Sequence, residues 1–361
     1  MPTHLILPGR ISPLKRLNRL LKSSPYQDAK FLLLVDENTS ELCMPLLLSE
    51  VEAFQEAEFL VIPVGEKSKS LEIAGEIWDS FLSEQADRNM VIVNLGGGCV
   101  SDLGGFVAAG FKRGIRYINV PTTLVGMVDA AVGGKTAINR GNFKNQIGFF
   151  YPPEIVCVNP AFLNTLPHQE MLSGLFEMKK TALLSGQEVL FQKDCYDDSK
   201  KQIFDSAIPT VDSISQCVKF KMDVCKADPF DKGVRKILNF GHTFGHAIES
   251  FSLSSLSPYS HGMAVGLGMW CELYLSVQKM GFPPECLKAY EGFLRQWANE
   301  IPSYQLKDTK TLLAFMQQDK KNIDGTIRCV LLQDIALPVI DVPISELEAC
   351  DALVKLGKLG A

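Results

Sequence analysis

Short apolar runs alternate with helical patterns through the first half of the chain. Four runs end at a polar residue, a glycine or a proline, and they cover residues 31–35 before Asp36, 59–64 before Gly65, 91–95 before Gly96, and 117–120 before Pro121. Between the second and third runs, in residues 70–85, apolar residues recur at helical spacing. Strands that alternate with helices predict an α/β fold with a parallel, doubly wound sheet.

The pattern changes in the second half of the chain. From about Pro167 onward β-branched runs are rare and amphipathic helical patterns dominate, with one late short strand expected over residues 330–332. Two prolines and two asparagines interrupt the pattern between residues 159 and 167, as is typical of a boundary. We therefore expect an α/β domain over residues 1–165 and a mostly α-helical domain over residues 166–361.

Composition narrows the class of protein. The chain has 361 residues, of which 46% are hydrophobic and 21% charged, which is typical of a globular protein with more than one domain. Its net charge of −5 argues against a nucleic-acid partner. We see no leader segment and no run near the ~20 apolar residues that a membrane helix needs. The ten cysteines are scattered singly, which favours reduced thiols in the cytoplasm.

Polar turns follow three of the expected strands. Gly96-Gly97-Gly98 precedes a helical pattern, so its backbone N–H groups suit a phosphate, although a tight strand-to-helix turn explains it equally well. Two further candidates are the segment 65–69, where Lys69 can reach a phosphate or ribose, and Pro121-Thr122-Thr123, which offers hydroxyl groups. Because the carboxyl ends of parallel strands share one edge of a sheet, the three together favour a dinucleotide site.

Three of the five histidines lie within 20 residues of one another: His242, His246 and His261. His242 and His246 are four residues apart, on one face of a helix, and a carboxylate would complete a three-ligand metal site. Glu177 and Glu249 are both candidates for that carboxylate. The alternative is that these histidines are structural and satisfied by hydrogen bonds, but their clustering favours a metal or catalytic site.

Several basic residues stand beside glycine, asparagine or histidine motifs. In Val132-Gly133-Gly134-Lys135-Thr136 two glycines present backbone N–H groups next to an ammonium, which suits a phosphate or a carboxylate. The spacing differs from that of a Walker P-loop. Such cations indicate an anionic small-molecule ligand.

In this order the motifs resemble those of 3-dehydroquinate synthases. The matching positions are Gly96-Gly97-Gly98 with Asp102, residues 106–109, Arg113-Gly114, Pro121-Thr122-Thr123, Val128-Asp129, residues 132–136, Lys144-Asn145, Leu166-Pro167, Glu177 with Lys180, Lys221, Arg235, residues 238–249, His261-Gly262 and residues 319–321. The block around His242 is the most specific of them. The resemblance spans about residues 36–332.

The resemblance implies a Rossmann-like N-terminal domain that binds NAD and a helical C-terminal domain that binds metal and substrate. The NAD site would comprise Asp36, Asn38, Glu66, Lys69, Gly97, Gly98, Asp102, Thr122, Thr123, Asp129, Lys135, Lys144 and Thr165. Glu177, His242 and His261 would hold one divalent metal ion, zinc or cobalt. This ligand set differs from the one that spacing alone suggests, because His246 would face the substrate phosphate instead of the metal.

The resemblance also implies the substrate, a seven-carbon sugar-acid phosphate. Its pocket would be lined by Arg113, Asp129, Lys135, Lys144, Asn145, Lys180, Lys221, Arg235, Asn239, His246, Lys320 and Lys321, of which Lys135, Lys180, Lys221, Arg235, Asn239 and His246 would be catalytic. The reaction would combine transient oxidation by NAD, phosphate elimination, re-reduction and intramolecular aldol closure to 3-dehydroquinate. A homodimer is expected, with Arg113 reaching into the site of the other copy.

Three alternatives stay open at the level of sequence. Another sugar phosphate cyclase, such as a 2-deoxy-scyllo-inosose, valiolone or aminodehydroquinate synthase, would share the cofactors, but Arg235 with Lys221 favours an acid substrate. A metal-dependent polyol dehydrogenase has no need of a phosphate pocket, so Lys135, Asn145 and Asn239 argue against it. A non-catalytic nucleotide-binding protein has no use for the intact Glu177, His242 and His261.

Overall fold

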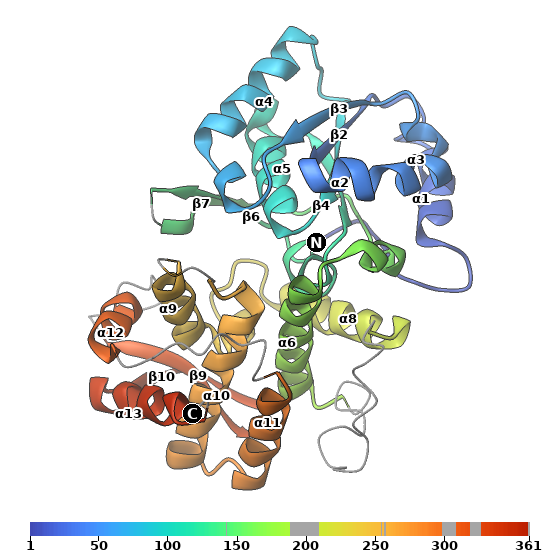
Figure 1. Cartoon of the computed structure of the whole chain (residues 1–361). Coiled ribbons are helices and arrows are strands. Elements are labelled where there is room, and N and C mark those ends of the chain that lie inside the picture. Colours follow the sequence, from blue (N-terminus) through green and yellow to red (C-terminus); the bar gives the residue numbers. More distant parts are fainter. Residues whose placement is uncertain are drawn as a thin grey trace. The chain divides into compact units, whose positions relative to one another are not determined.

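The structure is a computed structural model of the whole chain, and it describes residues 1–141, 143–187, 209–253, 255, 258–297, 308–317 and 326–359 (Figure 1). Backbone contacts divide the chain into two compact units. The first comprises Met1–Pro167 together with Thr210–Phe230, and the second comprises the rest. The division into 1–165 and 166–361 inferred from the sequence stays a prediction, since compactness alone places Thr210–Phe230 with the first unit.

A six-stranded parallel sheet forms the centre of the first unit, in the order β1-β8-β5-β4-β2-β3. Its strands are β1 (His4–Ile6), β2 (Phe31–Asp36), β3 (Glu58–Ile62), β4 (Val91–Gly96), β5 (Arg116–Pro121) and β8 (Ile155–Cys157). The chain runs from β2 outward to β3, returns to β4 on the other side of β2, and continues to β5 and β8. Sheets of this kind bind ligands at such a reversal, which here falls at the carboxyl ends of β2 and β4.

The first unit also contains helices, several of which lie against this sheet (Figure 1), whereas the helix of residues 211–227 contacts a helical turn. They are α1 (Pro13–Leu21), α2 (Glu37–Leu42), α3 (Met44–Glu50), α4 (Leu71–Ser83), α5 (Gly98–Gly110) and α8 (Val211–Ala227), with short helical turns at η1 (Glu52–Phe54), η2 (Glu66–Ser68), η3 (Phe111–Arg113), η4 (Gly126–Ala130) and η5 (Pro160–Thr165). α4 begins at Ser70, whose side chain accepts the Ile73 N–H, and it buries Ala74, Ile77 and Phe81 at helical spacing.

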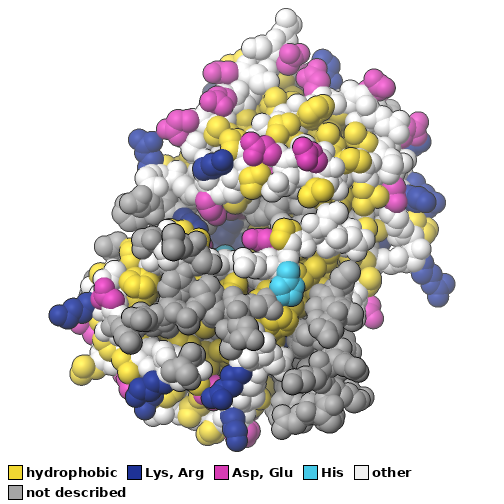
Figure 2. Space-filling model, in the orientation of Figure 1, with side chains coloured by type: hydrophobic (Ala, Val, Ile, Leu, Met, Phe, Trp, Pro, Cys, Tyr) yellow, Lys and Arg dark blue, Asp and Glu magenta, His cyan; other side chains and the backbone are white. Residues whose placement is uncertain are grey.

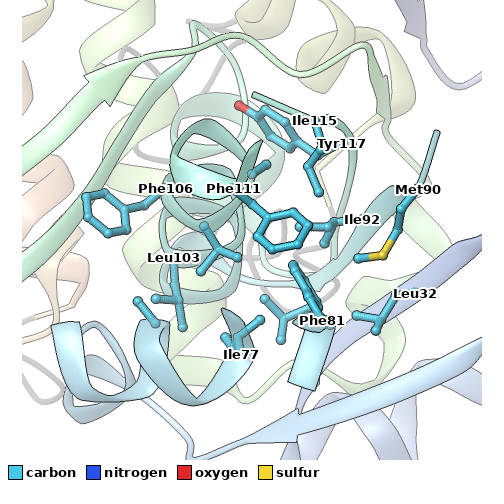
Figure 3. Close-up of a cluster of buried hydrophobic side chains, with 14 of the residues drawn as sticks. Leu32, Ile77, Phe81, Met90, Ile92, Leu103, Phe106, Phe111, Ile115 and Tyr117 are labelled. Carbon is cyan, nitrogen blue, oxygen red and sulfur yellow. The ribbon is translucent and has the colours of Figure 1, made fainter. Parts of the chain in front are cut away.

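The core between α4, α5 and the sheet is closely packed (Figure 3). The rings of Phe81 and Phe111 meet edge to face with their centroids 5.0 Å apart, beside Ile77 and Leu103. α5 lies so close to β4 that a Cβ on Gly104 would clash with the buried side chain of Asn94. This close contact fixes the middle of α5 against β4.

A hairpin of β6 (Lys135–Arg140) and β7 (Phe143–Phe150) forms a separate two-stranded antiparallel sheet that contacts α5. On the face of the molecule in Figure 2, acidic and basic side chains of the first unit are mixed, with apolar side chains between them. Exposed ion pairs such as Lys22 with Glu52 and Arg140 with Glu72 are screened by water and contribute little to stability.

The second unit is built around one long helix, α10 (His261–Met280). Around it lie α6 (His168–Ser185), η6 (Val234–Asn239), α9 (His242–Ser252), α11 (Pro284–Gln296), α12 (Thr309–Gln317), α13 (Glu346–Gly357) and an antiparallel hairpin of β9 (Ile327–Asp334) and β10 (Leu337–Ile344). α10 contacts α6, α9, α11, α13 and β9 (Figure 1). Gly262 and Gly266 bring it close to α6, because a Cβ on either would clash with Ser173 or Phe176.

The α/β fold class is confirmed, with a parallel sheet in the N-terminal part and a mainly helical C-terminal part. The four expected strands are present as β2, β3, β4 and β5, and the helix expected over residues 70–85 is α4. The late strand expected over 330–332 lies inside β9, which extends over eight residues and pairs with β10. Among the described residues, no helix is both long enough and apolar enough to span a membrane.

Two helical glycines should respond in opposite ways to substitution by alanine, because only one of them, Gly104, lies against a neighbouring strand. Gly104→Ala should lower the free energy of unfolding by about 1–3 kcal/mol, because Asn94 and its hydrogen bond to Asn119 must move. Gly75→Ala, in α4, should raise it by about 0.5–1 kcal/mol, because its Cβ meets nothing within 4 Å and the unfolded chain loses freedom. Urea denaturation of both variants measures the two changes, and a stable Gly104→Ala protein would contradict the packing.

Candidate functional site

Glu177, His242 and His261 bring three metal-ligating groups together inside the second unit. One ligand atom from each lies within 4.8 Å of the other two. The His261 Nε2 atom is 3.4 Å, and the His242 Nε2 atom 3.9 Å, from Glu177 Oε1. α6 provides the carboxylate, while the two imidazoles stand at the first residues of α9 and α10.

The second nitrogen of each imidazole faces an acceptor. His242 Nδ1 lies 3.1 Å from the carbonyl oxygen of Phe240, and His261 Nδ1 lies 3.2 Å from Glu249 Oε2. When Nδ1 donates its proton to such an acceptor, the tautomer is fixed and the Nε2 lone pair is left for a cation. The arrangement is therefore suited to ligation through both Nε2 atoms.

The electrostatics of the cluster favour a cation. Glu177 is 1% exposed, and its Oε2 atom lies 2.5 Å from the equally buried ammonium of Lys180. Burial disfavours a charged imidazole, but hydrogen bonds to Glu177 and Glu249 outweigh it and raise the pKa of His261 to about 10. A proton on His261 thus offsets part of the excess negative charge of Glu177 and Glu249. A divalent cation would offset that charge more fully.

One carboxylate oxygen and two imidazole nitrogens form a donor set that fits Zn²⁺ or Co²⁺. Three protein ligands also leave a coordination position open for water or a substrate, as catalytic sites require. His246, which spacing alone placed among the ligands, lies beside this set: its ring centroid is 5.3 Å from that of His242 and 6.1 Å from that of His261. Glu249, the other candidate carboxylate, instead contacts the far nitrogen of His261.

Arg235 and Asn239 lie on η6, the segment that precedes α9. Arg235 is buried, and η6 contacts α6, which carries Glu177 and Lys180. An ion pair of 2.6 Å between Lys236 and Asp341 holds η6 to β10. The two predicted substrate residues are therefore fixed on a segment that is anchored at both the helix and the hairpin.

In the first unit, a buried lysine joins several of the residues predicted to bind the cofactor. Lys69 Nζ lies 2.7 Å from Asp102 Oδ2 and 2.5 Å from Asn145 Oδ1. Burial disfavours its charged form, but Asp102 and then Glu66 outweigh that effect and raise the pKa of Lys69. Burial in turn raises the pKa of Asp102, against the opposing effect of Lys69.

Asn139 completes this network, and no sequence motif marks it. Its side chain donates to Glu66 Oε2 at 2.7 Å and accepts the backbone N–H of Asn145 at 2.9 Å. Its own N–H donates to the carbonyl oxygen of Lys69. An asparagine in the middle of a strand carries no motif, so only the position of β6 reveals its role.

The remaining predicted cofactor residues lie at strand ends of the same unit. Asp36 ends β2 and caps α2, in which Asn38 is exposed. Gly97 and Gly98 begin α5, where a Cβ on Gly97 would lie 2.9 Å from the Thr123 side chain. Cys43 lies among Asp36, Thr122 and Thr165, and burial raises its pKa to about 11.

The predicted substrate residues of the first unit differ in environment. Lys221, from α8, donates to both the side chain and the backbone carbonyl of Asp129 at 2.7 Å. Lys135 is exposed at the start of β6, and Lys144 is half-buried in β7. Arg113 is exposed in a turn whose residues 112–114 all have positive φ. Lys320 and Lys321 fall outside the described residues.

Two family models match consecutive parts of the chain. The one for the 3-dehydroquinate synthase N-terminal region matches residues 59–173, and the one for the C-terminal region matches residues 174–322. The 3-dehydroquinate synthase of Parabacteroides distasonis is 41% identical over 320 residues, covering 88% of each chain. The chain belongs to the 3-dehydroquinate synthase family.

A further relative supports this assignment. The 3-dehydroquinate synthase of Salinibacter ruber is 37% identical over 335 residues, covering 91% of this chain and 89% of its own. The family named from the motifs is therefore confirmed, and with it the enzyme class, a lyase. Both matched regions include site residues discussed above.

Solved structures share the fold. A 2-deoxy-scyllo-inosose synthase complexed with carbaglucose-6-phosphate, NAD⁺ and Co²⁺ gives a TM-score of 0.79 at 22% identity, covering 97% of this chain and 96% of its own. The 2-epi-5-epi-valiolone synthase of Streptomyces hygroscopicus subsp. jinggangensis 5008, with NAD⁺ and Zn²⁺ bound, gives the same score and identity over 99% of this chain and 97% of its own. A probable glycerol dehydrogenase of Sinorhizobium meliloti gives 0.60 at 14% identity, covering 99% and 97%.

The buried Lys69 network predicts a large stability effect. Lys69→Met should lower the free energy of unfolding by about 3–5 kcal/mol, because it leaves the Asp102 and Glu66 carboxylates without their ammonium. Adding Asp102→Asn should restore part of the loss. Urea denaturation measures both.

Lys22→Met is the matched control, because Lys22 pairs with Glu52 at 2.6 Å but on the exposed surface, where water screens the pair. Its stability should change little. Equal losses in the Lys69 and Lys22 variants would show that burial of the pair is unimportant.

Proposed function

We propose that this protein converts 3-deoxy-D-arabino-heptulosonate 7-phosphate into 3-dehydroquinate and phosphate, with NAD and one Zn²⁺ or Co²⁺ ion as cofactors. The observation that carries the proposal is the convergence of Glu177, His242 and His261 in a chain that belongs to the 3-dehydroquinate synthase family. The cytoplasmic location inferred from the sequence stays a prediction.

Glu177, His242 and His261 would hold the metal, which would supply Lewis acidity at a substrate hydroxyl. Lys180 would remain beside Glu177 and limit the negative charge that the carboxylate presents. Glu249 and the Phe240 carbonyl would keep both imidazoles in the tautomer that exposes Nε2. The donor set, its burial and its supporting hydrogen bonds all agree with this role.

Bound NAD⁺ would supply a reversible hydride acceptor. Asp36, at the end of β2, would accept hydrogen bonds from a ribose, and the N-terminus of α5 at Gly97 and Gly98 would face the pyrophosphate. Glu66, Lys69, Asp102, Thr122, Thr123 and Thr165 would complete the site, with Asp129, Lys135 and Lys144 near the nicotinamide end. Asp36, Glu66, Gly97, Gly98, Thr122 and Thr123 all lie at or just after the carboxyl ends of strands of one parallel sheet.

The substrate carries a carboxylate and a phosphate, so several cationic and amide groups must bind it. In the second unit these would be Lys180, Arg235, Asn239 and His246, of which Arg235 alone has the planar fork for bidentate binding of a carboxylate. In the first unit they would be Lys135, Asn145 and Lys221, with Lys221 held in place by Asp129. Lys320 and Lys321 would add further positive charge.

We also propose a homodimer in which Arg113 of the partner subunit reaches the substrate. Lys112, Arg113 and Gly114 adopt φ values of +46°, +67° and +112°. Left-handed backbone at two successive non-glycine residues is costly, and such strain is concentrated at functional sites. The turn presents Arg113 to solvent, as a contact with a second copy requires.

A second candidate is another sugar phosphate cyclase, favoured by the likeness of fold to the 2-deoxy-scyllo-inosose and valiolone synthases. That likeness, at 22% identity, concerns the fold alone. The relatives at 37–41% identity are 3-dehydroquinate synthases, which favours the acid substrate.

The proposed reaction predicts release of phosphate without net formation of NADH. The protein, given 3-deoxy-D-arabino-heptulosonate 7-phosphate, NAD⁺ and Co²⁺, should release one phosphate per substrate while the absorbance of NADH stays at its starting level. Chelation of the metal should abolish turnover, and Glu177→Gln should do the same. Glu52→Gln, which alters an exposed carboxylate of the first unit, should leave turnover unchanged.

Turnover of glucose 6-phosphate in place of the acid would support the 2-deoxy-scyllo-inosose alternative and refute the proposed substrate. Accumulation of NADH would indicate a dehydrogenase instead of a cyclase.

The raised pKa of His261 predicts that metal binding displaces a proton. A pKa of about 10 means that the imidazole is protonated at pH 7 in the metal-free protein, whereas ligation needs it neutral. Apparent affinity for Co²⁺ should therefore rise by up to about tenfold per pH unit between pH 6.5 and 8.5. Calorimetry in two buffers of different ionisation enthalpy should detect about one proton released per ion, and affinity independent of pH would contradict this account.

A further inference from the structure

The peptide group that joins Phe240 to Gly241 lies between two functional side chains. Its N–H donates to Glu272 Oε2 at 2.6 Å, and its carbonyl oxygen lies 3.1 Å from His242 Nδ1. Because the N–H and C=O of a trans peptide point in opposite directions, one rigid plane connects the Glu272 carboxyl group to the imidazole. All four residues belong to the second unit.

Close packing holds this peptide in place. Gly241 starts α9 with a φ of +80°, and a Cβ there would lie 2.8 Å from the carbonyl oxygen of Val265 and clash with Met269. On the other side, a Cβ on Gly268 would clash with the carbonyl oxygen of Gly241. The backbone of α9 therefore rests directly on α10, the helix that carries Glu272.

The cost of burial indicates that the Glu272 contact is functional. Glu272 has no exposed surface, in the middle of an otherwise apolar stretch of α10. An apolar residue would pack there at lower cost, because desolvating a carboxyl group is unfavourable. Its hydrogen bond orients the 240–241 peptide and, through polarisation, strengthens the carbonyl as an acceptor for His242 Nδ1.

We propose that Glu272 is a positioning residue for the metal ligand His242, acting through the 240–241 peptide. It is thereby the counterpart of Glu249, which contacts the other imidazole, His261, directly. The proposal rests on the metal site proposed above. Partners of this kind contribute about 10–100-fold to metal affinity in other metal sites.

Three variants separate this role from a structural one. Glu272→Leu keeps most of the side-chain volume and removes the acceptor. Glu272→Gln keeps an oxygen that can accept the Gly241 N–H. Leu273→Ala, at the next and equally buried position of α10, should destabilise the same helix while it leaves the Glu272 acceptor in place.

The measurement is titration with Co²⁺ alone, followed by calorimetry and by the visible d–d bands of the bound ion. Glu272→Leu should bind Co²⁺ about tenfold or more weakly, with altered d–d bands, because His242 is no longer held in its ligating orientation. Glu272→Gln should stay within about threefold of the unsubstituted protein, and Leu273→Ala should keep both affinity and spectrum despite a lower unfolding midpoint.

Unaltered affinity and spectrum in Glu272→Leu would overturn the proposal, as would an equal loss in Glu272→Gln, which would indicate charge and not hydrogen bonding. An effect in Leu273→Ala as large as in Glu272→Leu would reduce Glu272 to a packing residue. Failure of the unsubstituted protein to bind Co²⁺ would instead refute the proposed metal site, so the two failures are distinguishable.

Discussion

The structure of the second unit depends on one buried carboxylate, that of Glu177. Desolvating a carboxylate is expensive unless cationic groups and hydrogen-bond donors compensate it. Lys180 provides one such group, and the imidazoles of His242 and His261 face the other oxygen. The three helices that supply these groups, α6, α9 and α10, can meet because glycines allow their backbones to approach closely. The electrostatic compensation of Glu177 therefore depends on the close packing of these helices.

The first unit uses the same principle with the signs reversed. Lys69 is a buried ammonium, and Asp102 and Glu66 compensate it, while Asn139 and Asn145 join the network through hydrogen bonds. The lysine follows β3 and the aspartate lies on the helix that follows β4. A parallel sheet brings these segments to one edge, so residues far apart in sequence meet without any long loop.

The alternation of short apolar runs with helical patterns was enough to predict the α/β class and the strands β2 to β5. It missed β10, because Pro338 and Pro343 interrupt the strand pattern, although a two-stranded sheet tolerates prolines at its edges. It also missed the β6–β7 hairpin, of which the pattern singled out only Lys135-Thr136, as part of an anion-binding motif. β1 and β8 have three residues each, too few for a period to emerge.

Helical spacing alone predicted only part of the candidate metal site. Helical spacing places His242 next to His246, but it gives no information on the third ligand. His261 comes from the start of another helix, and only the contact of α10 with α6 and α9 brings it to Glu177. The resemblance to the family supplied that set where spacing did not. Neither source indicated Asn139 or Glu272, since their partners lie on other segments of the chain and include backbone N–H groups, which no sequence motif records.

The most direct test of the central claim is anomalous diffraction from crystals of the protein loaded with Zn²⁺, measured at the zinc edge. We expect a single strong peak about 2.0–2.2 Å from a carboxylate oxygen of Glu177 and from the Nε2 atoms of His242 and His261. A peak coordinated by His246 or Glu249 in place of one of these ligands, or located elsewhere in the chain, would contradict it.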